Sequence, residues 1–249
     1  MIPYLEHPTL DLGFYTIEAF RTLVLVAIIV QFEMTVRRAP RFDIPRETAS
    51  ALVGWAIGLG LVSAHVFDVV TYFPEKLVED PLEIFRVWGS LSSTGGMLGG
   101  LAGLAFVARR RGLSGDDLLG FVDVVIFALP FTLAIGRLGC GLQHDHLGVP
   151  STSPLAVAFP AGPRFDLGLL EFFWVTGIAI TFLVLDRAPR RPGFWLAAFF
   201  ALYAPVRFGL DFLRTGDATY AGLTPAQYLA IGATLAALTW IVRTRPRTG

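Results

Sequence analysis

The sequence has little of what stabilises most soluble proteins. Charged residues make up 16% of its 249 positions, against about a quarter in an average globular protein. A single cysteine, Cys140, excludes an internal disulfide and any metal site built from cysteines alone. The formal net charge is zero and Lys76 is the one lysine, so nothing in the charge balance indicates a nucleic-acid partner.

Hydrophobic residues are abundant instead, at 54%, and the mean hydropathy is +0.61. A membrane-spanning helix needs about 20 mostly apolar residues. The sequence therefore predicts an all-α, polytopic integral membrane protein that forms one membrane domain over residues 1–249. Its seven expected transmembrane helices cover about 14–33, 49–70, 91–108, 119–138, 168–186, 193–213 and 225–242.

The arginines predict the orientation of these spans. Positively charged residues are enriched in cytoplasmic loops. Thirteen of the twenty basic residues fall in alternate connecting segments: the loops after the first, third and fifth spans, and the C-terminal tail. We therefore expect the N-terminus outside and the C-terminus in the cytoplasm.

Ionisable residues inside the spans gather at one depth, near the outer surface. Burying a charge in a membrane costs about 2.5–3.5 kcal/mol on insertion scales, so such residues pair or line a polar cavity. Glu18 with Arg21, and Arg207 with Asp211, have the spacing of helical ion pairs. Two guanidiniums at one depth, Arg137 and Arg207, would instead attract an anion such as phosphate. The remaining members of this group are His65, Asp68 and Glu171.

Two further segments carry small or ligand-type residues. In the third span, Gly95, Gly99 and Gly103 recur every four residues, which favours close helix packing; contact with a ligand is the alternative. After the fourth span, Cys140, His144, Asp145 and His146 are all of metal-ligand type. The His-x-His spacing alone is a weak signal, so we expect no metal and no cofactor. Cys140 could be a nucleophile, a ligand or, most simply, a packing residue.

A set of motifs spread over almost the whole chain is typical of a known family. The motifs are Asp80-Pro81-Leu82, Phe85-Arg86-Val87-Trp88, Ser93-Thr94-Gly95-Gly96, Gly136-Arg137-Leu138-Gly139, Gly148 and Glu171, and most specifically Tyr203, Arg207-Phe208, Asp211-Phe212, Arg214, Asp217, Gly222-Leu223 and Gln227. In these residues the sequence resembles the phosphatidylglycerol–prolipoprotein diacylglyceryl transferases of bacterial inner membranes. The resemblance implies transfer of a diacylglyceryl group from phosphatidylglycerol, or a related anionic phospholipid, to the cysteine thiol of a prolipoprotein.

The resemblance and the chemistry of the residue types together give the expected site residues. The expected catalytic residues are His65, Arg137, Asp145, His146 and Arg207. The expected substrate-binding residues are Ser93, Thr94, Gly95, Gly96, Cys140, Gln143, His144, Gly148, Glu171, Tyr203, Asp211 and Arg214.

The chain departs from the family pattern where the chemistry is expected. Thr94 stands where the family usually has a histidine, and Cys140, Gln143 and Asp145 replace two asparagines and a glutamate. Either another histidine, His65 or His146, supplies the base, or the scaffold does something else. The alternatives are a transferase with another acceptor, a non-catalytic phospholipid-binding protein and, least favoured, a transporter or channel.

Overall fold

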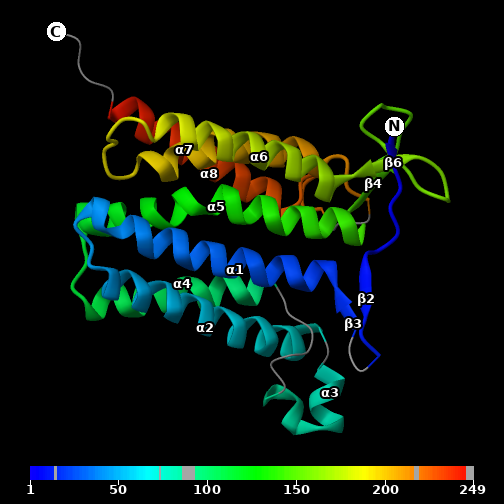
Figure 1. Cartoon of the computed structure of the whole chain (residues 1–249), viewed down its shortest axis with the longest axis horizontal. Helices are drawn as coiled ribbons and strands as arrows, with labels where there is room; N and C mark the ends of the chain where they lie inside the picture. Colours follow the sequence, from blue (N-terminus) through cyan, green and yellow to red (C-terminus); the bar gives the residue numbers. More distant parts are fainter. Residues whose placement is uncertain (14–15, 73, 86–92, 216–218, 245–249) are drawn as a thin grey trace. The chain divides into compact units, whose positions relative to one another are not determined.

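The computed structural model describes residues 1–13, 16–72, 74–85, 93–215 and 219–244. Seven helices of at least 18 residues lie in these ranges (Figure 1): α1 Ala19–Arg38, α2 Arg46–Tyr72, α4 Ser93–Arg110, α5 Gly115–Gln143, α6 Leu167–Leu185, α7 Phe194–Asp211 and α8 Pro225–Arg243. Shorter helical pieces are α3 Pro74–Glu79, η1 Ala39–Phe42 and η2 Pro81–Phe85.

Six of these helices, α1, α2, α5, α6, α7 and α8, are long and apolar enough to cross a membrane. The mostly helical, polytopic class predicted from the sequence is therefore confirmed. Three predicted boundaries are wrong by about five residues. The first helix covers Ala19–Arg38 rather than about 14–33, and the fourth predicted span continues to Gln143 rather than ending at 138.

The predicted all-α fold also contains short strands. One sheet has the order β1-β5-β6-β4, in which β1 pairs parallel to β5 and the other neighbours are antiparallel. A second sheet is a two-stranded hairpin, β2-β3, ahead of α1. The strands are β1 Ile2–Pro3, β2 Thr9–Asp11, β3 Thr16–Glu18, β4 Leu147–Pro150, β5 Val157–Ala158 and β6 Arg164–Asp166.

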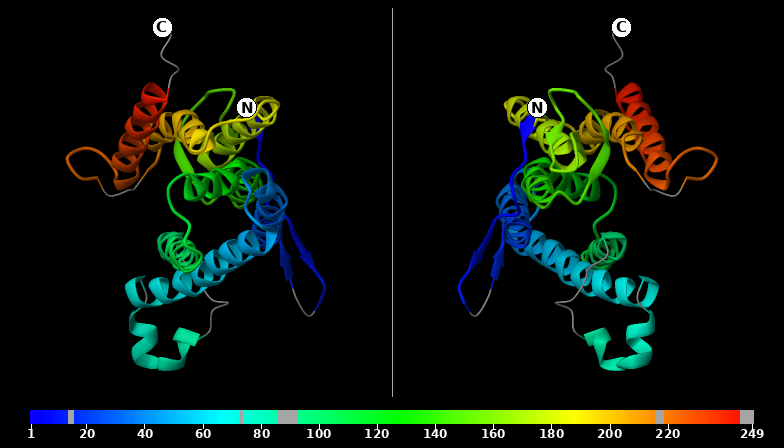
Figure 2. Two further views of the ribbon diagram at one scale, coloured as in Figure 1. Left: turned by 90° about the vertical axis from the view of Figure 1, so that its left-hand side faces the viewer. Right: turned by 90° about the vertical axis from the view of Figure 1, so that its right-hand side faces the viewer.

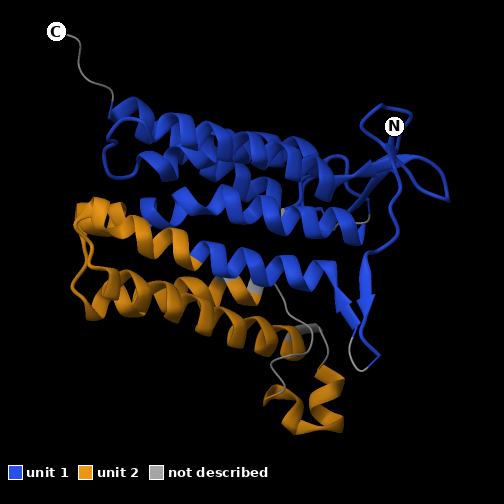
Figure 3. Cartoon of the chain, in the orientation of Figure 1, with its two compact units in different colours: residues 1–31, 122–249 blue, residues 32–121 orange. Residues whose placement is uncertain are grey.

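The chain divides into two compact units, whose boundaries fall within α1 and α5 (Figure 3). Unit 1 comprises residues 1–31 and 122–249, and unit 2 comprises residues 32–121. That all 249 residues form one membrane domain stays a prediction.

Unit 1 has an aromatic core, and in it a side chain of α5 caps the N-terminus of α7. Trp195 lies 4.8 Å, between ring centroids, from both Phe127 and Phe182. The Asp123 carboxylate accepts hydrogen bonds from the backbone N–H groups of Gly193 and Leu196, at 2.8 and 2.9 Å. It thereby satisfies the free amides at the start of α7, where the N-cap glycine has no side chain to do so. Helices α7 and α8 lie side by side (Figure 2).

Unit 2 is built on the packing of α2 against α4. A Cβ atom added to Gly103 would lie 2.6 Å from the carbonyl oxygen of Trp55, and one on Gly95 or Gly99 would overlap the α2 backbone. The four-residue glycine spacing is therefore a packing surface, because only a bare backbone allows this approach. The packing interpretation of this motif is confirmed for these three positions.

This packing gives a matched pair of substitutions on one helix. At Gly99 a methyl group would collide with Leu59 and Ser63, whereas at Gly100 its nearest neighbour, the Ala56 oxygen, is 3.6 Å away. We expect Gly99→Ala to lower the melting temperature in detergent, and Gly100→Ala to leave it unchanged or raise it, since alanine is the better helix former. Equal melting temperatures for the two variants would contradict the packing described.

Candidate active site

Two arginines from different helices share one buried carboxylate. Glu171, on α6, has a side chain only 4% exposed. One of its oxygens pairs with Nε of Arg137 on α5, and the other lies 3.2 Å from Nε of Arg207 on α7. Because Glu171 engages both Nε atoms, it fixes the two guanidinium groups beside each other. The prediction that Arg137 and Arg207 come together is thus confirmed.

A second buried carboxylate extends this cluster. Asp211 Oδ1 lies 2.8 Å from Nη1 of Arg207 and 4.0 Å from Nη1 of Arg214. Its other oxygen accepts a hydrogen bond from the Thr224 hydroxyl. Three guanidiniums therefore face two carboxylates, Glu171 and Asp211, in what we call the arginine cluster. Its one surplus positive charge suits an anionic ligand.

Glycines allow α5 and α6 to meet beside the arginine cluster. A Cβ on Gly168 would lie 2.9 Å from the backbone nitrogen of Gly141, so the helices touch through their backbones there. Arg137 lies one turn before Gly141 on α5, and Glu171 lies one turn after Gly168 on α6, so this contact sets the two side chains opposite each other. Tyr203, on α7, stacks on Phe199 and interacts with Arg137. The site is therefore held by packed helices rather than by loops, which favours a precise geometry.

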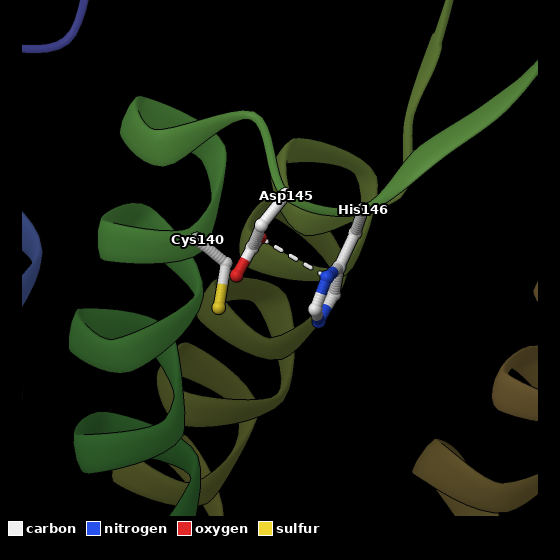
Figure 4. A group of neighbouring side chains, drawn as sticks. All are labelled: Cys140, Asp145 and His146. Atoms are coloured by element: carbon white, nitrogen blue, oxygen red, sulfur yellow. Dashed lines mark ion pairs between the residues drawn. The ribbon is translucent and has the colours of Figure 1, made fainter. Parts of the chain in front are cut away.

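Next to Arg137 lies a group of three potential ligand side chains (Figure 4), which we call the Cys140 cluster. The ligand atoms of Cys140, Asp145 and His146 all lie within 4.8 Å of one another. Asp145 Oδ1 is 3.0 Å from Nδ1 of His146. This hydrogen bond raises the pKa of His146 above its ordinary value, because a carboxylate favours the charged imidazolium.

His144 is separate from the Cys140 cluster. Its Nδ1 lies 2.6 Å from Oδ2 of Asp166, and its Nε2 lies 2.9 Å from the carbonyl oxygen of Leu5. Its ring also stacks on Tyr4, at 4.9 Å between centroids. Both ring nitrogens are therefore engaged, and the residue ties the N-terminal segment to the start of α6. In this structure His144 contacts structural partners.

Two further predicted residues, Gly148 and Gln143, lie near the Cys140 cluster in the sequence and differ in burial. Gly148 is buried in β4 and forms an isolated bridge with Arg214, and its carbonyl accepts from Nε of Arg164 at 3.0 Å. This bridge joins the segment that follows the Cys140 cluster to the segment that follows α7. Gln143 is exposed at the end of α5.

The other predicted site residues belong to unit 2. His65 is fully buried, and its Nε2 lies 2.9 Å from the carbonyl oxygen of Glu83. Gly95 and Gly96 lie on the face of α4 toward α2. Ser93 and Thr94 begin α4, and their side chains lie outside what the structure describes.

Glu18 and Arg21 form the ion pair that their spacing predicts, at 3.0 Å. Both side chains are substantially exposed, at 37% and 68%, and Glu18 lies in β3 ahead of the helix. An exposed pair of this kind contributes little to stability.

Two residues at the site were not predicted. Thr224 caps α8, holds Asp211 and completes a capping box with Gln227. Its signal was present in the sequence, since Thr224-Pro225-Ala226-Gln227 before an apolar run is the pattern of such a box. Asp166 caps α6 and binds His144. No spacing rule links these two residues, which are 22 positions apart.

Comparison with known proteins agrees with this arrangement. Residues 8–243 match the family described as prolipoprotein diacylglyceryl transferase. Three curated relatives bear the name phosphatidylglycerol–prolipoprotein diacylglyceryl transferase. The Vibrio campbellii protein is 31% identical over 86% of this chain and 82% of its own, and the Chromohalobacter salexigens protein is 30% identical over 98% and 94%. The Frankia alni protein is 29% identical over 87% of this chain, which spans about three fifths of that relative's length. The chain thus belongs to the prolipoprotein diacylglyceryl transferase family.

Proposed function

We propose that this protein transfers the diacylglyceryl group of phosphatidylglycerol to the cysteine thiol of a prolipoprotein. The observation that carries the proposal is the arginine cluster, in which Arg137 and Arg207 are held side by side by Glu171 on membrane-spanning helices. Family membership, which covers residues 8–243, supports the same activity.

The reaction needs a nucleophile and a stabilised leaving group. The thiol loses its proton, and the sulfur attacks the glyceryl carbon that bears the phosphate oxygen. A C–S bond forms, the C–O bond breaks, and its electron pair leaves with the phosphate oxygen of glycerol phosphate. Guanidinium groups stabilise that developing charge, since their fork of N–H donors matches phosphate oxygens.

We assign the phosphate-binding role to Arg137 and Arg207. Glu171 lies against the Nε atom of each arginine, and each guanidinium carries further N–H donors on its terminal nitrogens that can meet a phosphate. Asp211 orients Arg207 through Nη1, and Thr224 in turn holds Asp211.

We assign activation of the acceptor thiol to His146, with Asp145 as its orienting carboxylate. The His146 side chain is 28% exposed and lies in the Cys140 cluster, near Arg137. His65 is less suited, because it is fully buried and its Nε2 is next to the Glu83 carbonyl. Direct substrate contact by the other expected binding residues stays a prediction: Ser93, Thr94, Gly95, Gly96, Gln143, His144, Gly148 and Tyr203.

We also propose seven spans, with α4 as the seventh, in the bacterial inner membrane. Helix α4 has 18 residues and packs along α2. Arg37 and Arg38 end α1, Arg109 and Arg110 end α4, and Arg243 ends α8. Since cytoplasmic segments are enriched in arginine, these ends face the cytoplasm and the N-terminus lies outside.

A transfer assay tests the function. Purified protein in detergent is mixed with phosphatidylglycerol and a peptide bearing the acceptor cysteine, and mass spectrometry follows the products. We expect equal amounts of diacylglyceryl-thioether peptide and glycerol phosphate, and none with a peptide that has serine in place of cysteine. Phospholipid that stays bound and intact, with no thioether, would contradict a transferase and favour a phospholipid-binding role.

A further inference from the structure

The Cys140 cluster combines a thiol, an imidazole and a carboxylate at the C-terminal end of α5. Their ligand atoms lie within 4.8 Å of one another, and Figure 4 shows the three side chains turned toward a common point. These are the three side-chain types that bind zinc. A group of three different ligand types is a more specific arrangement than a His-x-His spacing, which the structure does not use because His144 points elsewhere.

The backbone that carries Asp145 and His146 is fixed both before and after these two residues. His144 adopts a left-handed conformation, with φ of 54°, and so ends α5 and reverses the chain. This turn returns Asp145 and His146 toward Cys140 in the last turn of the helix. The carbonyl of His146 then accepts from the N–H of Leu167, at 2.9 Å, where β4 begins. The cluster is therefore held by the fold before any ligand arrives.

The distances fit a metal ion with small side-chain adjustments. Zinc–ligand distances of about 2.0–2.3 Å place tetrahedral ligand atoms about 3.3–3.8 Å apart. Asp145 Oδ1 and His146 Nδ1 are already 3.0 Å apart. Cys140, Asp145 and His146 are each partly exposed, so they can make these adjustments. A thiolate and a carboxylate also neutralise a divalent cation, which reduces the electrostatic cost of placing it at the membrane boundary.

Three protein ligands leave a fourth coordination position open, as in catalytic zinc sites. Cys140 lies three residues after Arg137 on α5, so both side chains project from the same helix face. Arg137 also interacts with the Cys140 thiol. The open position would therefore be next to the phosphate-binding arginine.

We propose that Cys140, Asp145 and His146 form a binding site for a zinc-like divalent cation, and that its open position takes the acceptor thiol. The second half rests on the proposed transferase function. The incoming thiol displaces a bound water and gives its proton to solvent, and the sulfur stays on the metal as thiolate, the nucleophilic form. The thiolate then attacks the glyceryl carbon, and glycerol phosphate leaves toward Arg137 and Arg207. Coordination to the metal thus produces the thiolate, which in the metal-free protein would form by proton transfer to His146.

The first test is binding alone. Full-length protein in detergent is stripped with a chelator and titrated with Co²⁺, and Zn²⁺ affinity is then measured by competition with a chromophoric chelator. We expect one ion per chain and a thiolate-to-cobalt charge-transfer band. Cys140→Ser should remove the band, and both Cys140→Ser and His146→Gln should weaken Zn²⁺ binding at least 100-fold. His7→Gln, which changes an exposed histidine outside the cluster, should bind as the unmodified protein does. Unchanged affinity in Cys140→Ser and His146→Gln would overturn the site.

The second test separates the metal site from the function. The transfer assay is run on stripped protein and again after addition of one equivalent of Zn²⁺. Loss of product on stripping, with recovery on addition, would support the thiol-binding role. Full activity of the stripped protein would overturn that role while leaving the transferase intact. Stoichiometric Zn²⁺ binding without product in either form would contradict the proposed function and, with it, the acceptor thiol as fourth ligand.

Discussion

Replacing Arg207 with lysine should lower kcat/KM for phosphatidylglycerol about 100-fold, the effect typical of losing one preorganised donor to a developing charge. Lysine keeps the positive charge but cannot contact Glu171, Asp211 and a phosphate with one planar group. The chain should still fold, because a cation remains beside both buried carboxylates. Rates of thioether formation, measured across a range of lipid concentrations, check the prediction.

Arg21→Lys is the matched control. Arg21 also pairs with a glutamate, Glu18, but both of these side chains are substantially exposed. We expect unchanged kcat/KM in this variant. If Arg207→Lys were as active as Arg21→Lys, the phosphate would not be held by the guanidinium of Arg207.

The second large effect is expected at Glu171. In Glu171→Gln one amide oxygen remains to accept from one arginine, and the amide nitrogen faces the other, so the two guanidiniums lose their fixed spacing. Displacements of about 1 Å can cost on the order of 100-fold in rate. The variant is also more positive, so the anionic lipid should bind at least as tightly. We therefore expect kcat to fall roughly 10- to 100-fold without a rise in KM.

A positioning residue is distinguished from a merely structural one by the melting temperature together with kcat per folded molecule. General loss of structure would lower the melting temperature and reduce kcat only in proportion to the folded fraction, whereas lost positioning lowers kcat of the folded protein at a retained KM and melting temperature. Glu18→Gln, at the exposed pair, should change neither constant. A Glu171→Gln variant with normal kcat would show that the shared carboxylate does not set the arrangement that catalysis needs.

The helices were the most predictable part of the fold. The long apolar runs, bounded by arginines such as Arg109 and Arg187, put the later predicted spans within a few residues of α6, α7 and α8. The end of the fourth span was not predictable in the same way. Gly139 and Gly141 suggest a chain leaving the helix, but α5 continues to Gln143, with Gly139 packed against α1 and Gly141 against α6.

The strands could not be predicted because they have almost no local signal. They are two to four residues long, and none shows the alternation of buried and exposed residues that identifies longer strands. Their pairing depends on distant segments, such as Ile2 with Val157. The stretch from 139 to 167, which contains β4, β5 and β6, is rich in Gly and Pro, a composition typical of loops.

The site was predictable in its residue types and only partly in its geometry. Spacing gave the Arg207–Asp211 pair, because four residues make one helical turn. It could not show which histidine would join Cys140. That choice depends on the left-handed turn at His144 and on Asp166, whose position follows from β6 and α6 rather than from the neighbouring sequence.

One measurement tests most directly whether the sulfur of the acceptor cysteine attacks the diacylglyceryl carbon and displaces glycerol phosphate from it. Phosphatidylglycerol carrying ¹⁸O in the bond between the diacylglyceryl carbon and the phosphate is given to the purified protein with the acceptor peptide. Attack at that carbon, with the phosphate held by Arg137 and Arg207, predicts that all the ¹⁸O leaves in glycerol phosphate and that the product is a thioether. Recovery of ¹⁸O in the lipid product would mean that the phosphorus–oxygen bond breaks instead, and would contradict the proposed chemistry.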